Sequence, residues 1–436
     1  MRRPWHRALL LAAAAAGLAR AAEPAPAGAA SGGPEPQSAI SHDSPPPQGI
    51  ARWLDPTAAP FIPVPEIDVD PNSGTTLGLI PTWLVTDAQG QVRRIIAPDV
   101  LYNPYFGYGA RGRIFSYPSE DTQWSVVAGA KQRVESEFDY EYQTGRLRDT
   151  TWSFTGSAVY DRSGTPRFYG IGNNSTIYDE TNYTLQQKYV QTNVGWNVNR
   201  ELQLSYTLRM REVDVQPGTL AGIASLQSRF GQILGVGTNH EVLNRFAVTY
   251  DTRDDPTVPT HGGAYTVFGG VADRTGIFHA SLYSVVGIDA KQLWSLAPGE
   301  VIVVHGALRY MPGTAHVPFW SLSTLGGATS VIGEQQPLRG FGEGRFYDRN
   351  AFSSSLEYRH RIASVDAMST RIDVEATPFI DAGEVFAHSR TSPVSHLHKV
   401  AGLGFRGIAS PFVVGYVDIG YGSEGAAVFT GINYPF

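Results

Sequence analysis

The chain has 436 residues, no cysteine and a formal net charge of −6, and 42% of its residues are hydrophobic. The absence of cysteine excludes disulfides, thiolate metal sites and cysteine nucleophiles, and the acidic balance provides no basic field for nucleic acid. The 47 glycines and 21 tyrosines are typical of chains with many strands, tight turns and aromatic belts. This length fits two or three soluble domains or one large barrel.

The N-terminus has the three parts of a secretory signal peptide. Arginines within the first seven residues precede an apolar run over residues 8–19, and the small-x-small triplet Ala-Arg-Ala follows at 19–21. We therefore expect residues 1–21 to be a cleaved signal peptide. After it, no run approaches the roughly 20 apolar residues of a membrane helix.

Residues 22–74 are rich in Pro, Ala and Gly, as in EPAPAGAASGGPEPQ and PFIPVPEIDVDP. Such a composition does not bury a core. We expect it to form a periplasmic leader without a folded module, so that the barrel occupies residues 75–436.

Beyond the leader, apolar and polar residues alternate over long segments. The clearest is 201–211, where one face carries Leu202, Leu204, Tyr206, Leu208 and Met210, and the other carries only polar residues. This period of two predicts β-strands. Alternation also occurs in soluble β-sandwiches, but these segments run for about 10 to 15 residues, whereas soluble strands average about 5 to 6. Strands that cross a membrane need roughly 9 to 11.

The predicted fold is therefore all-β, a transmembrane antiparallel β-barrel of about 16 strands with a long inward-folded loop. We place the strands at 76–86, 91–101, 104–117, 122–136, 147–161, 184–199, 201–215, 241–253, 262–273, 278–293, 299–311, 349–361, 370–381, 399–409, 411–421 and 426–436.

The stretch 325–350, LGGATSVIGEQQPLRGFGEGRFYDRN, interrupts this array. Its glycines and Pro337 argue against helix or strand, and it is too long for an ordinary hairpin. At its centre lies Arg339, which needs a carboxylate partner if it is buried inside a barrel. The downstream segments SSSLEYRH and TPFIDAGEVF offer Glu357 and Asp381.

The last predicted strand ends the chain on an aromatic residue. Val428, Thr430, Ile432, Tyr434 and Phe436 alternate on one face. A terminal strand of this kind resembles the C-terminal signal by which outer-membrane barrels are recognised for insertion, with Tyr434 and Phe436 as its aromatic residues.

Five pieces resemble the BamA/TamA-type outer-membrane barrels, also called bacterial surface antigens. They are PRFYGIGNN (166–174), VTYDTRDDPTVPTHGG (248–263), PLRGFGEGRFYD (337–348), TPFIDAGEVF (377–386) and the GINYPF end.

The resemblance implies a loop folded into the lumen through the motif Leu338, Arg339, Gly340 and Phe341. Arg339 would then pair with Asp381 and pack on Phe379, with Glu357 as a second inward carboxylate. It also implies that the first and last strands close the barrel at a weak seam used for lateral opening.

The function implied is a part in inserting or transporting proteins or lipids at the bacterial outer membrane. The partners would be outer-membrane lipids, together with unfolded outer-membrane proteins or a separate periplasmic partner. Members of this family carry polypeptide-transport-associated domains before the barrel, and we expect none in the leader. A passive pore or structural barrel is the alternative.

No residue set predicts an enzyme, a cofactor or a metal site. The histidines at 388, 396 and 398 share one hairpin loop, where solvated side chains are commoner than metal ligands. The chain also lacks a G-x-S-x-G nucleophile motif.

Overall fold

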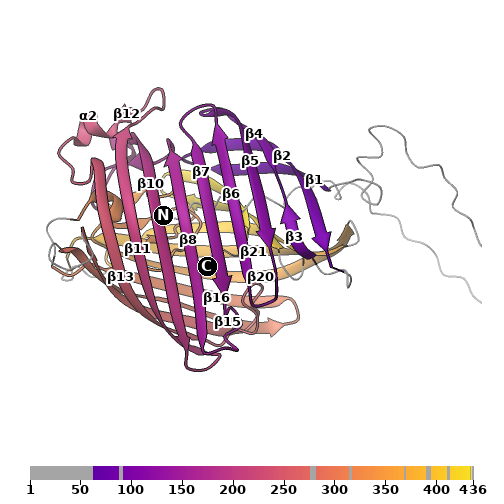
Figure 1. Cartoon of the computed structure of the whole chain (residues 1–436). Coiled ribbons are helices and arrows are strands. Elements are labelled where there is room, and N and C mark those ends of the chain that lie inside the picture. The colour runs from indigo at the N-terminus through magenta and orange to yellow at the C-terminus, as the bar shows by residue number, and fades with distance from the viewer. Residues whose placement is uncertain are drawn as a thin grey trace, which may run out of the picture.

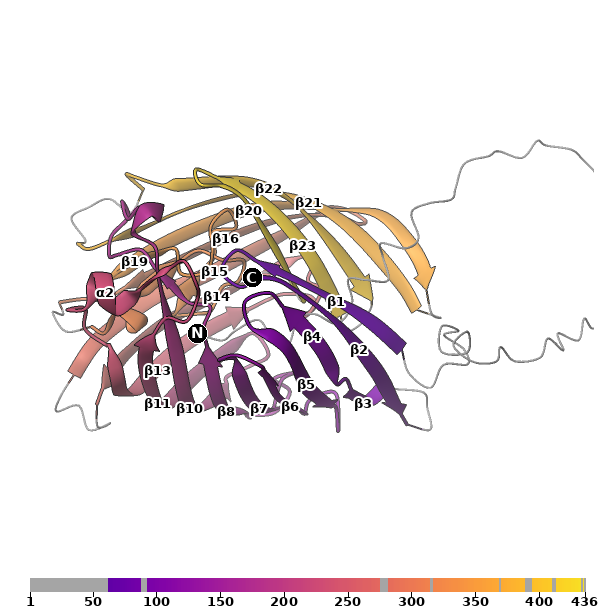
Figure 2. The ribbon, with the colours of Figure 1, turned by 90° about the horizontal axis from the view of Figure 1, so that it is seen from above.

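The computed structural model describes residues 62–87, 92–274, 281–313, 317–367, 370–388, 394–409, 413–432 and 434. The predicted signal peptide and most of the predicted leader lie outside these residues. The described part is mostly strand with almost no helix, and one large antiparallel sheet curls into a barrel (Figures 1 and 2). The all-β barrel is therefore confirmed.

The barrel strands follow one another in chain order, and each pairs with the next except β3 and β4, which both pair with β2 and β5. Their bounds are β1 Ile62–Asp70, β2 Gly74–Thr86, β3 Val92–Ile96, β4 Asp99–Asn103, β5 Gly107–Ser116, β6 Gln123–Lys131, β7 Ser136–Thr144, β8 Trp152–Ser163, β10 Thr181–Asn197, β11 Leu202–Pro217, β13 Gly237–Asp251, β14 Gly262–Asp273, β15 Ser281–Ala297, β16 Glu300–Tyr310, β20 Asn350–Ala367, β21 Thr370–Phe386, β22 His398–Ala409, β23 Val413–Gly422 and β24 Gly425–Ile432.

Short elements gather at one end of the barrel. They are β9 (Arg167–Phe168), η1 (Ile177–Asp179), β12 (Ala224–Ser225) and α2 (Leu226–Phe230), and we call this end the α2 end (Figure 1). Within the described residues, no helix has the length and apolar character needed to cross a bilayer.

The strand count is higher than about 16. If β3 and β4 are taken as one strand interrupted at Ala97 and Pro98, eighteen strands surround the lumen. The two additional strands are β1 and β7. The sequence hid β7 because the turn before it has no Gly, Pro or Asn, and instead uses Val134 at a φ of 60°.

β1 lies inside the stretch expected to be leader, so the sheet begins at Ile62 rather than at residue 75. Its prolines suggested an extended linker. In the structure, β1 pairs along its whole length with β2, from Ile62 opposite Thr82 to Asp70 opposite Gly74.

The two faces of the wall are reversed relative to a soluble protein. Among the largest fully buried side chains are Arg113, Arg359 and Arg406, whereas Phe246 and Tyr421 are more than 60% exposed on the outer face. On β11, Leu204 and Met210 point outward while Arg209 and Arg211 are buried inside. An apolar exterior around a charged interior is the arrangement of a membrane barrel.

Candidate functional site

The long segment between β16 and β20, residues 311–349, folds back into the barrel; we call it the lumen loop. Three short strands, β17 (Ser323–Leu325), β18 (Gln335–Gln336) and β19 (Phe346–Asp348), give it a small sheet of its own. Seen from above, β19 lies near α2 (Figure 2), and Tyr347 of β19 shares an apolar cluster with Leu226 of α2. Apart from residues 314–316, which are not described, it is largely buried.

Arg339 lies at the tip of the lumen loop and is completely buried. Its guanidinium donates from Nε and Nη2 to the two carboxylate oxygens of Asp381, at 2.8 and 2.7 Å. Nη1 donates to Glu357, and Nη2 donates to the Ser355 hydroxyl at 2.8 Å. The guanidinium carbon also lies 3.6 Å from the centre of the Phe379 ring. The structure thus brings Arg339 together with Asp381, Glu357 and Phe379.

The ion pairs continue beyond these residues to Asp418, Arg406 and Arg359. Asp418 lies 3.3 Å from Nη1 of Arg339 and also pairs with Arg406. Glu357 accepts from Arg359 at 3.2 Å. Three guanidinium groups therefore face three carboxylates. We call these six residues the clamp network: Arg339, Arg359, Arg406, Glu357, Asp381 and Asp418. Balanced pairing is what buried ions require.

Two glycines of β23 form the seat of the loop tip. A Cβ at Gly420 would lie 2.0 Å from the carbonyl oxygen of Arg339, and one at Gly422 would lie 2.8 Å from the Phe341 ring. The loop backbone can approach β23 this closely only because neither residue has a side chain. Leu338 and Phe341, on either side of the tip, pack into an apolar cluster with Phe379 and Val400.

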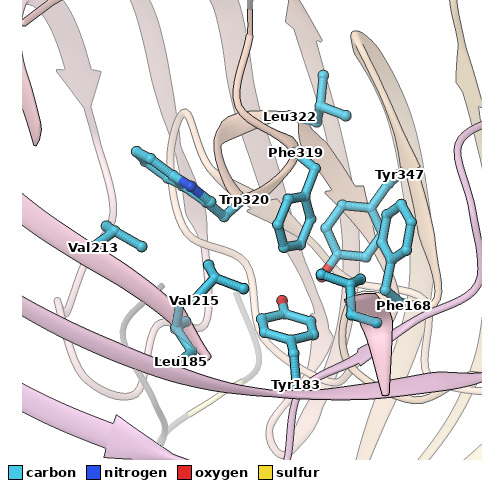
Figure 3. Close-up of a cluster of buried hydrophobic side chains, with 10 residues drawn as sticks. Phe168, Tyr183, Leu185, Val213, Val215, Phe319, Trp320, Leu322 and Tyr347 are labelled. Atoms are coloured by element: carbon cyan, nitrogen blue, oxygen red, sulfur yellow. The ribbon is translucent and has the colours of Figure 1, made fainter. Parts of the chain in front are cut away.

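A second apolar cluster covers the lumen at the α2 end (Figure 3). Phe168 packs edge-on against Phe319 and Tyr347 of the lumen loop, with ring centres 5.2 Å apart in both cases. Tyr183 of β10 contacts the Phe319 ring in the same way. Aromatic pairs of this geometry contribute about 0.5–1.5 kcal/mol each beyond their burial.

The lumen loop also joins the two hairpins at the ends of the sheet. Asn72, in the turn between β1 and β2, donates to the carbonyl of Glu343 at 2.7 Å. Arg345 pairs through its Nε with Glu424, in the turn between β23 and β24, at 2.9 and 3.0 Å. Residues 343–345 therefore connect the first and last hairpins of the barrel.

A third set of contacts fixes the loop to the opposite wall. Glu334 pairs with Arg209 of β11. Arg309 of β16 donates to the carbonyls of Gly333 and Ser321 at 2.9 and 3.0 Å.

The end of the chain departs from the predicted alternation. Phe436 lies outside the described residues. Tyr434 does not continue the outward face of β24, because its ring lies 3.5 Å from the Arg359 guanidinium and its hydroxyl donates to Glu375 at 3.0 Å. It therefore turns inward, next to the clamp network.

One serine, histidine and aspartate meet in the lumen. His305 and Ser330 each lie 3.2 Å from the same oxygen of Asp289. In a hydrolase triad the histidine stands between the hydroxyl and the acid. Here the carboxylate stands in the middle, so Asp289 orders the loop and the histidine does not activate the serine.

Comparisons with known proteins agree with this architecture. A sequence model described as the Omp85 superfamily domain matches residues 122–413. Among solved structures, BamA from Haemophilus ducreyi lacking POTRA domains 1–3 matches with a TM-score of 0.52 and 14% identity, over 81% of this chain and 74% of that chain. CdiB from Escherichia coli matches with a TM-score of 0.44 and 14% identity, over 85% of this chain and 62% of that chain. No curated protein sequence matches. At this identity, the likeness to BamA is one of fold.

Proposed function

Because the chain belongs to the Omp85 superfamily of outer-membrane barrels, we propose that it takes part in inserting or translocating proteins, or lipids, at the outer membrane. Its partners would be the membrane lipids, and unfolded outer-membrane proteins or a separate periplasmic protein. No chemical step is needed, because a labile edge in the wall would lower the barrier to insertion.

The observation that carries this proposal is the junction between β1 and β24. Every other neighbouring pair of barrel strands has a backbone ladder, but between these two the described residues form none. Instead, the Thr430 hydroxyl accepts from the Val69 N–H and donates to Asp68, both at 3.0 Å. We call this junction the seam.

The sequence of β1 weakens the seam. Val69 directs its N–H toward β24, and alternate N–H groups of a strand point to the same edge. Pro63 and Pro65 lie an even number of residues before Val69, and the pairing of β1 with β2 has no bulge. Their backbone nitrogens therefore face β24 too, and because proline has no N–H, two donors are missing from that edge. In a bilayer, an unsatisfied backbone group costs several kcal/mol. A client strand that pairs with the free edge would relieve that cost.

The test uses the seam as a switch. The chain has no cysteine, so Asp68→Cys with Thr430→Cys introduces a single possible disulfide. In liposomes, the reduced protein should speed the folding of a test barrel, followed by gel shift, and the oxidised protein should not. Reduction of the same sample is the matched control.

Equal acceleration in both redox states would contradict the seam as the route. Ion conduction without any acceleration would favour the passive pore. An open pore is disfavoured because the lumen loop lies inside the barrel and is largely buried there.

A further inference from the structure

A small cavity between the lumen loop and the wall strands β11, β13, β15 and β16 is unusually rich in arginine. It is lined by Arg209, Arg211, Arg245 and Arg309, with Glu334 and Trp320 from the loop. Its empty space is about 450 Å³, part of it open to solvent. We call it the arginine cavity.

The charges around this cavity do not balance. Glu241 accepts from Arg211 at 2.8 Å and from Arg209 at 3.2 Å, and Glu334 pairs with Arg209. Within the described residues, Arg245 and Arg309 form no ion pair. Arg245 donates to the carbonyl of Ile332 at 2.8 Å, and Arg309 donates to two carbonyls and a serine hydroxyl. Four guanidinium groups thus face two carboxylates, and two positive charges are left over.

Two other buried charge networks of the barrel carry no positive excess. The clamp network has three cations and three anions. On the far wall, Arg111 and Arg113 lie within ion-pair distance of both Glu66 and Asp99, at 2.5 to 3.4 Å, and Arg111 also lies 3.5 Å from Glu137. The positive excess at the arginine cavity is therefore not shared by these two networks.

Burial makes the excess costly. A guanidinium cannot lose its proton in a protein, and a buried charge without a counter-ion is strongly unfavourable. This cost falls on Arg309, which is 3% exposed, whereas Arg245 is only half-buried. In addition, the Nε groups of Arg209 and Arg211 are buried and have no hydrogen-bond partner among the described residues. The residues that line the cavity thus carry more positive charge than their two carboxylates neutralise.

We propose that the arginine cavity binds a phosphate group, either as a free ion or as part of a lipid headgroup. A phosphate monoester carries about −1.5 to −2 charges near neutral pH, which matches the excess of two. Its oxygens also suit the paired N–H groups of arginine. Arg245 and Arg309 would supply the charge that the two carboxylates leave unmatched.

Equilibrium dialysis of the detergent-solubilised full chain against radiolabelled inorganic phosphate tests this directly. The intact protein should bind about one phosphate saturably. Arg245→Gln should weaken binding at least about tenfold, since a charge-assisted hydrogen bond is lost. Arg200→Gln, at an exposed pair with Asp149, is the matched control and should bind normally. No saturable binding, or equal affinity in Arg245→Gln, would overturn the site.

A second variant separates binding from folding defects. Glu334→Gln removes a competing carboxylate and raises the positive excess, so it should bind phosphate more tightly than the intact chain. A variant that is merely destabilised would not gain affinity. Weaker binding by folded Glu334→Gln would count against the proposal.

A second experiment distinguishes a free phosphate ion from a lipid headgroup. The protein is extracted from vesicles of phosphatidic acid or of phosphatidylcholine and examined by native mass spectrometry. If the site binds a lipid headgroup, the protein should retain a lipid, and inorganic phosphate should displace it. Saturable binding of the inorganic ion without a retained lipid assigns it to the free ion.

Discussion

At the residue scale, the position of the lumen loop inside the barrel depends chiefly on Arg339. Its guanidinium is wholly buried and its partners come from three different strands, β20, β21 and β23. Removing one member of such a network leaves the others unpaired, which costs about 3–5 kcal/mol. This cost is much larger than the contribution of an exposed ion pair.

We therefore expect Arg339→Ala to lower barrel stability by about 3–5 kcal/mol, measured by urea unfolding in lipid vesicles with heat-modifiable gel mobility as the readout. Asp381→Asn should give a loss in the same direction. Arg361→Ala, which breaks a partly exposed pair with Asp373 on the same strands, is the control and should change stability by less than about 1 kcal/mol. Full stability of Arg339→Ala would refute the clamp.

The sequence pointed to part of this network. A buried arginine in a loop demands an acid, which pointed to Glu357 and Asp381, and the resemblance to known barrels added Phe379. The structure places all three around Arg339. Arg406 and Asp418 were missed because an inward-facing charge on an alternating strand looks like any other lumen residue. Only the pairing register of β22 with β23 brings these two side chains together.

At the scale of elements, β23 acts as the seat for the loop because it lacks side chains at two positions. We expect Gly420→Ala to displace the loop tip, since its Cβ would overlap the Arg339 carbonyl, at a cost of about 1–3 kcal/mol. Limited proteolysis within residues 334–345 should become faster.

Gly407→Ala on the neighbouring strand β22 is the matched control for this substitution. The nearest atom to its Cβ would be 3.9 Å away, so the proteolysis rate should not change. If Gly420→Ala digests as slowly as the control, the loop tip does not rest on β23 as described.

The bridge formed by residues 343–345 predicts that the lumen loop controls the seam. Arg345→Ala should free the β23–β24 hairpin from the loop, because it removes the contacts with Glu424 and with Ser175. Disulfide formation between cysteines at 68 and 430 should become slower or incomplete. Lys188→Ala, at an exposed pair with Glu212, should leave cross-linking unchanged, and an equal effect of both substitutions would refute the coupling.

Element prediction succeeded where alternation was long and failed where a turn or a proline was misread. β11 was found because it carries an apolar face from Leu202 to Met210. β7 was missed because the turn at Val134 lacks turn-forming residues, and residues 137–146 were assigned to no strand. β1 was assigned to the leader because its prolines suggested an extended linker. A strand tolerates Pro63 and Pro65 only at an edge without a backbone ladder, and the composition does not reveal which strand has such an edge.

At the scale of the whole molecule, the lumen loop closes the interior. We expect planar bilayers with the intact protein to show small conductance, because the loop and the aromatic cluster at the α2 end fill the lumen. Arg339→Ala should give larger, fluctuating conductance as the loop leaves its seat. Arg361→Ala serves as the control, and large conductance in the intact protein would contradict a closed lumen.

The order in which the partners of the lumen loop occur along the chain has a consequence for biogenesis. Glu334 pairs with Arg209, which precedes the loop, whereas the carboxylates around Arg339 lie at 357, 381 and 418, all of which follow it. During vectorial export, the first contact is available early, but Arg339 gains its carboxylate partners only as β20 and β21 arrive, and the set is complete only with Asp418 of β23. Docking of the tip would thus act as a completion checkpoint, and a molecule stalled before β23 would expose its loop to quality-control proteases.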